Sequence, residues 1–249
     1  MKCLLALLLL PLALMACGKG ADSGTPSAPA SPVAPVVAPK GQDWLQVVSK
    51  TPEGGYVVGN PDAPIKLLEY GSRTCPTCGA FGRTAMQPLE NMYVKSGKVS
   101  YEYRDFLVHG PPDLPASLLG RCVGTATFFA VLEAMYQGQA PFEEKLSDQT
   151  ATAALQQKLV NAPGPAIANG WADYMGFVDF MKQRGLPEAK ARACLNDQAA
   201  IDQLTKMMDD AGRAPYNVTG TPSFYINGKK LDTALSWPDV EQALRASGA

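Results

Sequence analysis

The sequence is poor in the residues on which several common activities depend. It contains a single histidine, His109, so neither a Ser-His-Asp triad nor a multi-histidine metal site is expected. It also lacks a dense run of Lys or Arg and has a net charge of -1, so nucleic acid is not an expected partner. With 18% charged and 46% hydrophobic residues, the chain resembles a folded soluble protein in composition rather than a disordered or polytopic membrane protein. The chemistry is therefore expected from the six cysteines.

The first residues have the pattern of an export signal. Lys2 is followed by an apolar stretch, residues 4–14, that is too short to span a bilayer, which predicts a signal peptide over residues 1–16. Residues 14–17, Leu-Met-Ala-Cys, resemble the processing box of bacterial lipoproteins, in which cleavage leaves Cys17 as an acylated N-terminus. An ordinary signal peptide followed by a coincidental cysteine is the alternative.

A segment without helical or strand periodicity follows the signal. It is rich in Pro, Ala, Ser and Gly, which predicts a flexible, lipid-anchored linker over residues 17–43. Residues 44–249 suffice for one well-buried domain that includes an inserted subdomain. The signal and the anchor together predict a location in the periplasm of a Gram-negative bacterium, at either the inner or the outer membrane.

The folded part alternates between strand patterns and helix patterns. Gly54-Gly55 predicts a hairpin between residues 44–48 and 56–58, and Asn227-Gly228 predicts a second hairpin with a type I′ turn. Further strands are predicted at residues 65–70, 98–108, 224–226 and 229–231, and helices at residues 75–93 with a kink at Pro88, 198–212 and 238–246. Between about residues 111 and 196 the pattern is helical throughout. These patterns predict an α/β sheet domain interrupted by an all-helical subdomain.

Cys75-Pro76-Thr77-Cys78 stands at the predicted start of a helix. This spacing places two thiols one turn apart on the same face, within reach of a disulfide. Cys75 is expected at the positive end of the helix dipole, which favours the nucleophilic thiolate, and Cys78 deeper in the helix as the resolving thiol. One alternative is half of a structural zinc site, which is disfavoured because the sequence has no second CxxC and no pair of histidines. The other is a purely structural disulfide.

Two segments flanking this motif carry a family resemblance. Residues 68–72, Leu-Glu-Tyr-Gly-Ser, precede it, and residues 220–224, Gly-Thr-Pro-Ser-Phe, lie far downstream. Together with the CxxC they resemble the DsbA-like branch of the thioredoxin superfamily over roughly residues 44–244, with the helical insertion in its usual place. The resemblance implies a thioredoxin-like fold and thiol-disulfide oxidoreductase activity. It also implies that the Cys75–Cys78 disulfide is the only redox group, without a further cofactor or a metal.

The resemblance assigns roles to three residues outside the CxxC. Pro222 matches the cis-proline of the family, which lies against the disulfide and offers its backbone to an extended substrate. Thr221 stands at the position that tunes substrate release and redox poise. Glu69 matches a buried carboxylate whose pKa is raised by desolvation and which shuttles a proton to or from Cys78. An ordinary proline at the start of a strand and a glutamate at the surface are the alternatives.

Pro76 and Thr77 are expected to contact the substrate together with the cis-proline loop. Pro76 suits the first helical turn, which does not use its N–H. Strongly oxidising members of the family carry His where this chain has Thr77, which cannot supply an imidazolium to stabilise the Cys75 thiolate. We therefore expect the pKa of Cys75 to lie between those of DsbA, about 3.5, and thioredoxin, about 7. The oxidising power should be weaker than in the His-containing members.

Cys122 and Cys194 lie in the predicted helical subdomain. Two such thiols are expected to pair in an oxidising compartment, and some DsbA-like proteins of alphaproteobacterial type carry a second bond in this region. The resemblance thus favours a structural Cys122–Cys194 disulfide, with two buried free thiols as the alternative. His109 is expected to be a loop residue without a special role.

The preferred function is a monomeric enzyme that donates its disulfide to exported proteins and is re-oxidised by a membrane partner. A reductase or an isomerase that uses the same centre is the first alternative. A non-catalytic lipoprotein that binds a partner is the second. The combination of Glu69, the CxxC and Thr221-Pro222 disfavours the second, because a binding module has no use for a proton shuttle.

Overall fold

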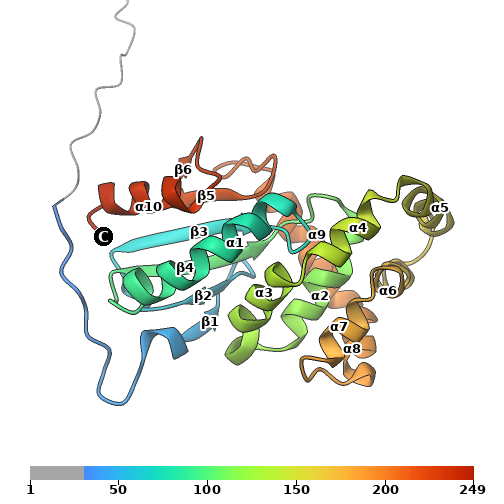
Figure 1. Ribbon diagram of the computed structural model, residues 1–249, viewed down its shortest axis with the longest axis horizontal. Helices are drawn as coiled ribbons and strands as arrows, with labels where there is room; N and C mark the ends of the chain where they lie inside the picture. The colour runs from blue at the N-terminus through green and yellow to red at the C-terminus, as the bar shows by residue number, and fades with distance from the viewer. Residues whose placement is uncertain (1–30) are drawn as a thin grey trace, which may run out of the picture.

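The computed structural model describes residues 31–249, which form a mixed sheet joined to a group of helices (Figure 1). The described strands, in the order β1-β2-β4-β3-β5-β6, are β1 (Val48–Lys50), β2 (Tyr56–Val58), β4 (Val99–Asp105), β3 (Ile65–Gly71), β5 (Ser223–Ile226) and β6 (Lys229–Leu231). β3 and β4 are parallel, and the other neighbours are antiparallel. Both parallel strands therefore end at the same end of the sheet, where Gly71 pairs with Asp105. The CxxC follows β3 at this end.

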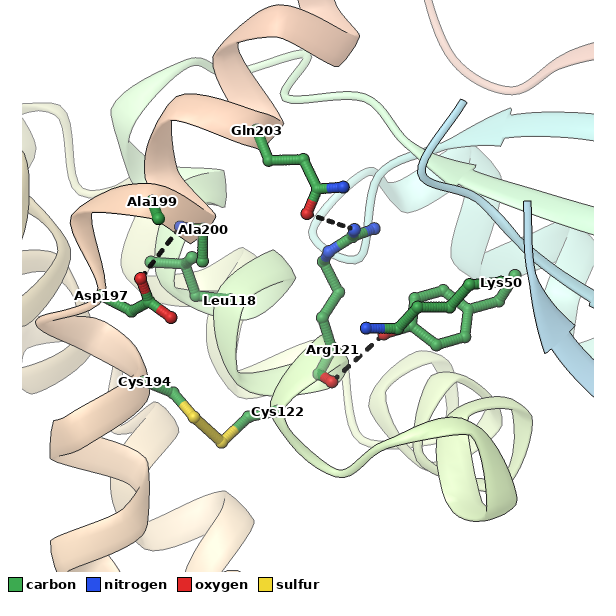
Figure 2. A pocket seen from close by; sticks show the side chains of 10 residues that line it. Lys50, Leu118, Arg121, Cys122, Cys194, Asp197, Ala199, Ala200 and Gln203 are labelled. Atoms are coloured by element: carbon green, nitrogen blue, oxygen red, sulfur yellow. Dashed lines mark hydrogen bonds between the residues drawn. A yellow bond between two sulfur atoms is a disulfide. The ribbon is translucent and has the colours of Figure 1, made fainter. Parts of the chain in front are cut away.

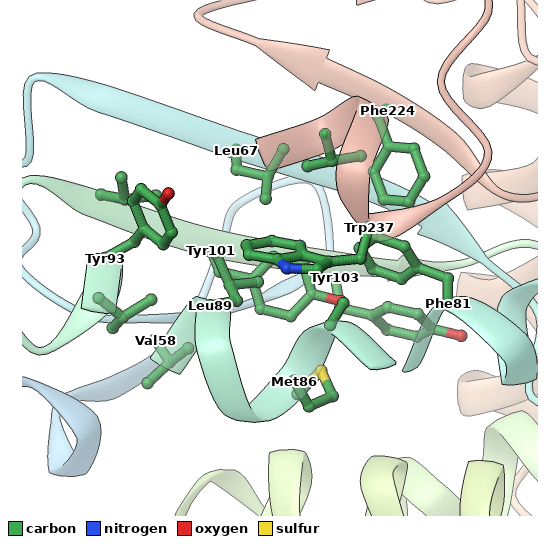
Figure 3. Close-up of a cluster of buried hydrophobic side chains, with 14 of the residues drawn as sticks. Val58, Leu67, Phe81, Met86, Leu89, Tyr93, Tyr101, Tyr103, Phe224 and Trp237 are labelled. Atoms are coloured by element: carbon green, nitrogen blue, oxygen red, sulfur yellow. The ribbon is translucent and has the colours of Figure 1, made fainter. Parts of the chain in front are cut away.

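Alternating residues of the strands build a core on one face of the sheet (Figure 3). Leu67 and Tyr101 point to this face and pack with Phe81 and Trp237 from the covering helices. The helices that contribute to this core are α1 (Pro76–Pro88), α3 (Phe128–Gln137) and α10 (Trp237–Ala246). The CxxC cysteines belong to the same core, so this motif is part of the packed interior.

The opposite face of the sheet has a smaller core. Leu68, Tyr70 and Tyr225 alternate with the residues of the first core and pack with Ala211, at the end of α9 (Gln198–Ala211). Both faces of the central strands are therefore covered. This explains why β3 has buried residues on both faces instead of alternating with polar ones.

The helical subdomain predicted at about residues 111–196 is confirmed. It has its own core around Trp171 and contributes the following elements: η3 (Pro111–Asp113), α2 (Leu114–Cys122), η4 (Thr125–Thr127), α3, α4 (Ala140–Ser147), α5 (Gln149–Leu159), α6 (Gly164–Met175), α7 (Phe177–Lys182) and α8 (Glu188–Leu195). α3 joins the two parts, since Leu132 packs into the sheet core and Met135 into the helical core. Within the described residues no single helix is long and apolar enough to cross a membrane. Only the pair Pro111–Cys122 and Thr125–Gln137 together has the required length and composition, and its two segments are bent by 109° relative to each other.

The prediction of a strand at residues 44–48 is wrong. Trp44–Gln46 forms a 3-10 turn instead, and only the residues after it pair in β1. Asp43 accepts a hydrogen bond from the backbone N–H of Leu45, and the Trp44 indole donates to the Val36 carbonyl at 2.7 Å. These bonds fix a local turn that competes with pairing in the sheet.

Two other local predictions are refined by the structure. The helix that begins after the CxxC changes at Pro88, where α1 ends and the π-helical turn η2 (Leu89–Val94) begins. Proline has no N–H for the α-helical ladder, which accounts for a change of helix type at this point. The type I′ turn between β5 and β6 is confirmed, because Asn227 and Gly228 both have positive φ, 50° and 80°.

The predicted signal peptide (residues 1–16), Cys17 and residues 17–30 of the predicted linker lie outside the described residues. Residues 31–43 contain no helix or strand but contact the sheet domain. The N–H of Val33 donates to the Gly248 carbonyl at 2.8 Å, and that of Val36 donates to the Ser96 carbonyl at 2.9 Å.

Candidate active site

Cys75 and Cys78 lie at the N-terminus of α1, directly after the strand β3. Cys75 is the N-cap residue, with extended backbone, and Cys78 lies in the first turn. Cys75 is 6% exposed and Cys78 is 0% exposed, so the first cysteine is the one that a substrate can reach. Both carry free thiols. Within residues 31–249 they are not part of any group of three or more His, Cys, Asp and Glu side chains that could hold a metal ion.

The two thiols have pKa values shifted in opposite directions. A hydrogen bond from the Cys78 thiol, with smaller contributions from the Thr221 side chain and from backbone N–H groups, lowers the pKa of Cys75 to about 5. Burial raises the pKa of Cys78 well above its ordinary value, and the hydrogen bond to Cys75 and the charge of Glu69 raise it further. The pKa of Cys75 thus lies between those of DsbA and thioredoxin, about 3.5 and about 7. This agrees with the expectation drawn from Thr77.

The loop that carries Pro222 approaches Cys75 from the other side. The peptide bond between Thr221 and Pro222 is cis, and Cys75 Sγ lies 3.5 Å from the Thr221 carbonyl oxygen. Pro222 is buried and Thr221 half-buried, whereas Pro76 and Thr77 are exposed. A hollow of about 230 Å³ borders Thr221 and Pro222 on a side that no residue of the CxxC lines. The structure therefore places all four residues expected to contact the substrate next to the nucleophile.

Glu69 lies in the middle of β3, between Tyr103 of β4 and Phe224 of β5. It is 0% exposed, and the Tyr101 hydroxyl donates a hydrogen bond to its Oε2 at 2.6 Å. Its Oε1 has no hydrogen-bond partner among the described residues. Burial raises the pKa of Glu69 to about 8, the Tyr101 bond opposes this shift and the Cys75 charge adds to it. A carboxyl group that holds its proton near neutral pH can give it to a neighbouring thiolate.

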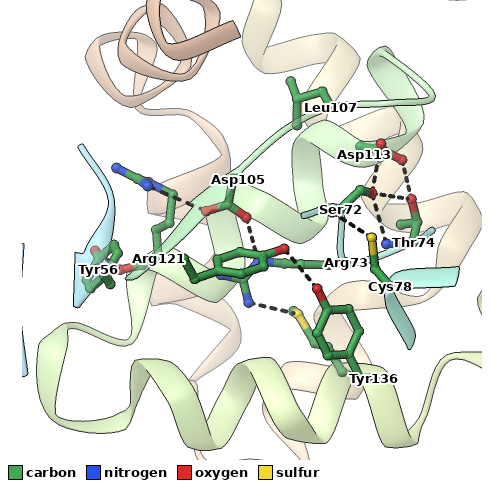
Figure 4. Close-up of polar contacts among 12 residues, drawn as sticks. Tyr56, Ser72, Arg73, Thr74, Cys78, Asp105, Leu107, Asp113, Arg121 and Tyr136 are labelled. Carbon is green, nitrogen blue, oxygen red and sulfur yellow. Dashed lines mark hydrogen bonds and ion pairs between the residues drawn. The ribbon is translucent and has the colours of Figure 1, made fainter. Parts of the chain in front are cut away.

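Sequence reasoning missed a polar cluster beside the CxxC (Figure 4). Asp113 Oδ2 accepts a hydrogen bond from Ser72 Oγ at 3.0 Å, its Oδ1 accepts one from the Thr74 hydroxyl, and Oδ1 also lies 3.0 Å from His109 Nδ1. His109 lies in a loop, as predicted, but its ring contacts the segment that precedes Cys75. These residues meet because the loops after two parallel neighbouring strands leave the sheet at the same end. To predict this cluster, one would have needed to know which strands are neighbours in the sheet.

Two further buried side chains, Arg73 and Gln139, form hydrogen bonds that fix the segment around the CxxC. Arg73 Nε donates to Asp105 Oδ1 at 2.8 Å, and both side chains are 0% exposed. Gln139, between α3 and α4, donates from Nε2 to the carbonyl oxygens of Cys75 at 2.8 Å and Arg73 at 3.2 Å. Because Gln139 belongs to the helical subdomain, this subdomain binds the backbone of the nucleophile directly. Neither contact has a local sequence signal.

Cys122 and Cys194 are joined by a disulfide that links α2 to α8, with their Cα atoms 6.1 Å apart. The disulfide borders a hollow of about 380 Å³ that is also lined by Arg121 and Asp197 (Figure 2). No residue of the CxxC or of the cis-proline loop lines this hollow. The second disulfide thus belongs to the helical subdomain and not to the redox centre.

The chain is similar to several proteins named for disulfide chemistry. A family model described as thioredoxin matches residues 51–246. The crystal structure of a protein-disulfide isomerase from Novosphingobium aromaticivorans has a TM-score of 0.72 and 31% identity, and the match covers 77% of this chain and 96% of that one. The crystal structure of Wolbachia pipientis alpha-DsbA1, with a TM-score of 0.55, 22% identity and coverage of 76% and 88%, has the same fold.

Curated relatives give a similar result. A Rickettsia bellii protein named protein-disulfide oxidoreductase is 27% identical over 188 residues, which are 76% of this chain and 62% of the relative. The chain therefore spans about three-fifths of the length of this relative. The family model covers most of the chain, and the Novosphingobium protein is matched over nearly its whole length. The chain belongs to the thioredoxin family and has the fold of DsbA-type proteins, with an inserted helical subdomain.

Proposed function

We propose that this protein is a thiol-disulfide oxidoreductase that donates its Cys75–Cys78 disulfide to the cysteines of exported proteins. The observation that carries the proposal is the opposite shift of two thiol pKa values one helical turn apart, to about 5 for Cys75 and upward for Cys78. A stabilised Cys75 thiolate favours the reduced form of the pair, so the oxidised pair readily accepts electrons. The disulfide itself is the redox group, and the reaction needs no separate cofactor.

The first step is the attack of a substrate thiolate on Cys75 Sγ. A bond forms between the substrate sulfur and Cys75 while the Cys75–Cys78 bond breaks, and Cys78 leaves as a thiolate. Because burial raises the pKa of Cys78, this thiolate takes up a proton. Glu69 holds a proton up to a pH of about 8 and interacts with Cys78, so we assign it the role of donor.

The second step releases the product. Another thiolate of the substrate attacks the substrate sulfur of the mixed disulfide and expels Cys75 as a thiolate. The low pKa of Cys75 makes it a good leaving group. Two electrons have then moved from the substrate to the enzyme, which ends with a Cys75 thiolate and a Cys78 thiol. A membrane redox partner that removes these electrons would complete the cycle.

We assign substrate contact to the four residues around the nucleophile. Pro76 and Thr77 are exposed beside Cys75, and the carbonyl oxygen of Thr221, the residue before Pro222, lies 3.5 Å from Cys75 Sγ. An extended substrate segment placed between these two sides brings its cysteine to Cys75 Sγ. Such a site holds the backbone of the substrate and accepts many sequences.

Trapping of the mixed disulfide tests the proposal. In a Cys78→Ser variant the resolving thiol is missing, so exported proteins should accumulate in disulfides with Cys75 and separate under reducing conditions. The matched Cys75→Ser variant should trap none. In vitro, the oxidised wild-type protein should convert the thiols of a reduced, unfolded ribonuclease to disulfides. Equal trapping by both variants, or a failure to oxidise the ribonuclease, contradicts the proposal.

Isomerase activity is the second candidate, because the Novosphingobium relative with 31% identity is named a protein-disulfide isomerase. An isomerase starts from the reduced pair and rearranges existing disulfides. Reactivation of scrambled ribonuclease by the reduced protein, faster than oxidation of reduced ribonuclease by the oxidised protein, would favour this candidate.

We further propose that the mature protein is a periplasmic monomer anchored through an acylated Cys17. The support is the sequence pattern of residues 1–17, a short apolar stretch that ends in Leu-Met-Ala-Cys. Metabolic labelling with a fatty acid should mark the wild-type protein and not a Cys17→Ser variant. An unlabelled wild-type protein would indicate an ordinary signal peptide.

A further inference from the structure

The loop between β4 and α2 carries the only histidine of the chain to the side of the CxxC. The His109 side chain is 38% exposed, and its Nδ1 lies 3.0 Å from Thr74 Oγ1, in the residue that precedes Cys75. The loop follows β4, the parallel neighbour of the strand that leads into the CxxC. The topology therefore places an imidazole in contact with the residue that directly precedes the nucleophile, although the two lie far apart in the sequence.

The imidazole is held in place by a buried carboxylate. Asp113 has a side chain that is 1% exposed, and its Oδ1 lies 3.0 Å from His109 Nδ1. Its Oδ2 accepts hydrogen bonds from the backbone N–H of His109 at 2.9 Å and from Ser72 Oγ at 3.0 Å. Within residues 31–249, His109 is the only cationic group within 4.0 Å of this carboxylate. A buried carboxylate favours a protonated partner, so the ring is poised to carry a positive charge.

The same cluster is connected to both cysteines. The Thr74 hydroxyl donates a hydrogen bond to Asp113. Cys75 follows Thr74 directly in the chain. Ser72 bonds to Asp113 through its hydroxyl, and its backbone N–H donates to Cys78 Sγ at 3.5 Å. Hydrogen bonds of this cluster thus connect His109 to the segment that leads into the CxxC.

We propose that His109 is a positioning residue whose protonated ring stabilises the Cys75 thiolate from the loop before α2. This inference rests on the proposed function, since it concerns the same pair of thiols. Thr77, between the two cysteines, carries no charge. Here a positive charge would be supplied from a different element of the fold, at partial exposure and therefore with a weaker effect.

The groups that face the ring support this coupling. They are Asp113, the residue before α2, and Cys75, the residue before α1. The hydrogen bond to Asp113 is the main cause that raises the pKa of His109, and the charge of Cys75 raises it further while burial opposes both. Interaction between two charges is reciprocal, so a charged ring also lowers the pKa of the thiol, as a contribution smaller than those of Cys78, Thr221 and the backbone N–H groups.

The redox state of the pair determines whether this interaction exists. In the oxidised protein Cys75 is bonded to Cys78 and carries no charge. Reduction adds two electrons, and one proton is taken up by Cys78 while Cys75 stays a thiolate. The negative charge beside His109 therefore appears only on reduction, and the pKa of His109 must be higher in the reduced than in the oxidised protein.

Titration of the single imidazole by NMR tests this directly. The protein is prepared without a histidine tag, so that every imidazole signal comes from His109, and it is titrated once with the disulfide formed and once after reduction by dithiothreitol. We expect the pKa of His109 to be higher in the reduced protein by about half a unit or more. Equal pKa values in the two states would overturn the inference.

Two variants separate the charge from the hydrogen bonds. His109→Asn keeps a side-chain N–H for Asp113 but has no charge, and His109→Lys keeps the charge. The pKa of Cys75, measured by alkylation with iodoacetamide at different pH values, should rise in the Asn variant and return toward the wild-type value in the Lys variant. An Asn variant with the wild-type pKa would show a purely structural role and overturn the inference.

These measurements are independent of substrate turnover. If Cys75 and Cys78 cannot be oxidised to a disulfide by a chemical oxidant, the proposed function fails. If they can be oxidised and the pKa of His109 does not change, only the further inference fails.

Discussion

At the scale of single residues, Glu69 is a carboxyl group without exposed surface in the middle of the sheet. Burial raises its pKa from 4.5 to about 8, so the folded protein retains a proton that the unfolded chain releases. Between these two pH values the folded state binds more protons than the unfolded state, and stability falls as the pH rises. The contribution of protonated Glu69 is thus fully present below a pH of about 4.5 and is lost as the pH rises through about 8.

We predict that Glu69→Gln removes this pH dependence. In the oxidised protein, where the two thiols do not titrate and the small contribution of the Cys75 charge is absent, the unfolding free energy of the wild type should fall relative to the variant between about pH 5 and about pH 8, by on the order of 3 kcal/mol. Unfolding by denaturant at the two pH values measures this. Other titrating groups cancel in the comparison. A constant difference between the two proteins at both pH values would show that Glu69 does not titrate in this range.

Thr77 is exposed between the cysteines and adds no charge to the centre. We predict that Thr77→His lowers the pKa of Cys75 from about 5 by about one unit, because an imidazolium beside the thiolate stabilises it. The pH dependence of iodoacetamide alkylation gives this pKa. Thr77→Asn, a polar and uncharged control, should leave it near the wild-type value. If the Asn variant shifts the pKa as much as the His variant does, charge is not the cause.

At the scale of elements, the helical subdomain holds the CxxC through Gln139. Its Nε2 donates to the Cys75 carbonyl oxygen at 2.8 Å, and a Cβ atom at Gly79 would overlap with its Oε1, so α1 and the subdomain are in close contact here. We predict that Gln139→Leu lowers the unfolding free energy by about 1–3 kcal/mol, because two buried carbonyl groups lose their donor. Denaturant unfolding measures the loss.

The neighbouring Gln137 supplies a matched control for this prediction, because it is exposed. Gln137→Leu makes the same chemical change without removing a buried donor, and it should alter the stability by no more than about 0.5 kcal/mol. Equal losses in the Gln137 and Gln139 variants would mean that the contact with the CxxC is not the reason.

Local patterns in the sequence were sufficient to predict most elements. The apolar run of β3, the Asn227-Gly228 turn and the all-helical subdomain each depend on neighbouring residues, and the structure confirms them. The strand at residues 44–48 was wrong because hydrogen bonds of Asp43 and Trp44 favour a turn over pairing in the sheet.

The candidate site was predictable only in part. The CxxC is a local pattern, and the resemblance to DsbA-like proteins pointed to Glu69 and Pro222. The contacts of Asp113 with His109 and of Gln139 with Cys75 were not predictable from patterns along the chain. They depend on which strands are neighbours and on how the helical subdomain sits against α1, and these are properties of the whole fold.

At the scale of the whole molecule, the Cys122–Cys194 disulfide closes a loop of 72 residues across the helical subdomain. Such a link restricts the unfolded chain, and a loop of this length contributes up to about 4 kcal/mol in the chain-entropy model. We predict that a Cys122→Ser/Cys194→Ser variant loses stability by up to that amount in denaturant unfolding. The comparison belongs in a Cys75→Ser/Cys78→Ser background, so that only this disulfide changes. A variant as stable as its parent would contradict the predicted structural role.

The oxidase function is tested most directly by the reduction potential of the Cys75–Cys78 pair in the intact protein. Equilibration with glutathione buffers of known ratio, followed by quantification of the oxidised fraction, gives this value. With a Cys75 pKa of about 5, we predict a potential between that of thioredoxin, about -270 mV, and that of DsbA, about -120 mV. A potential at or below that of thioredoxin would contradict the assignment as a disulfide donor and indicate a reductase.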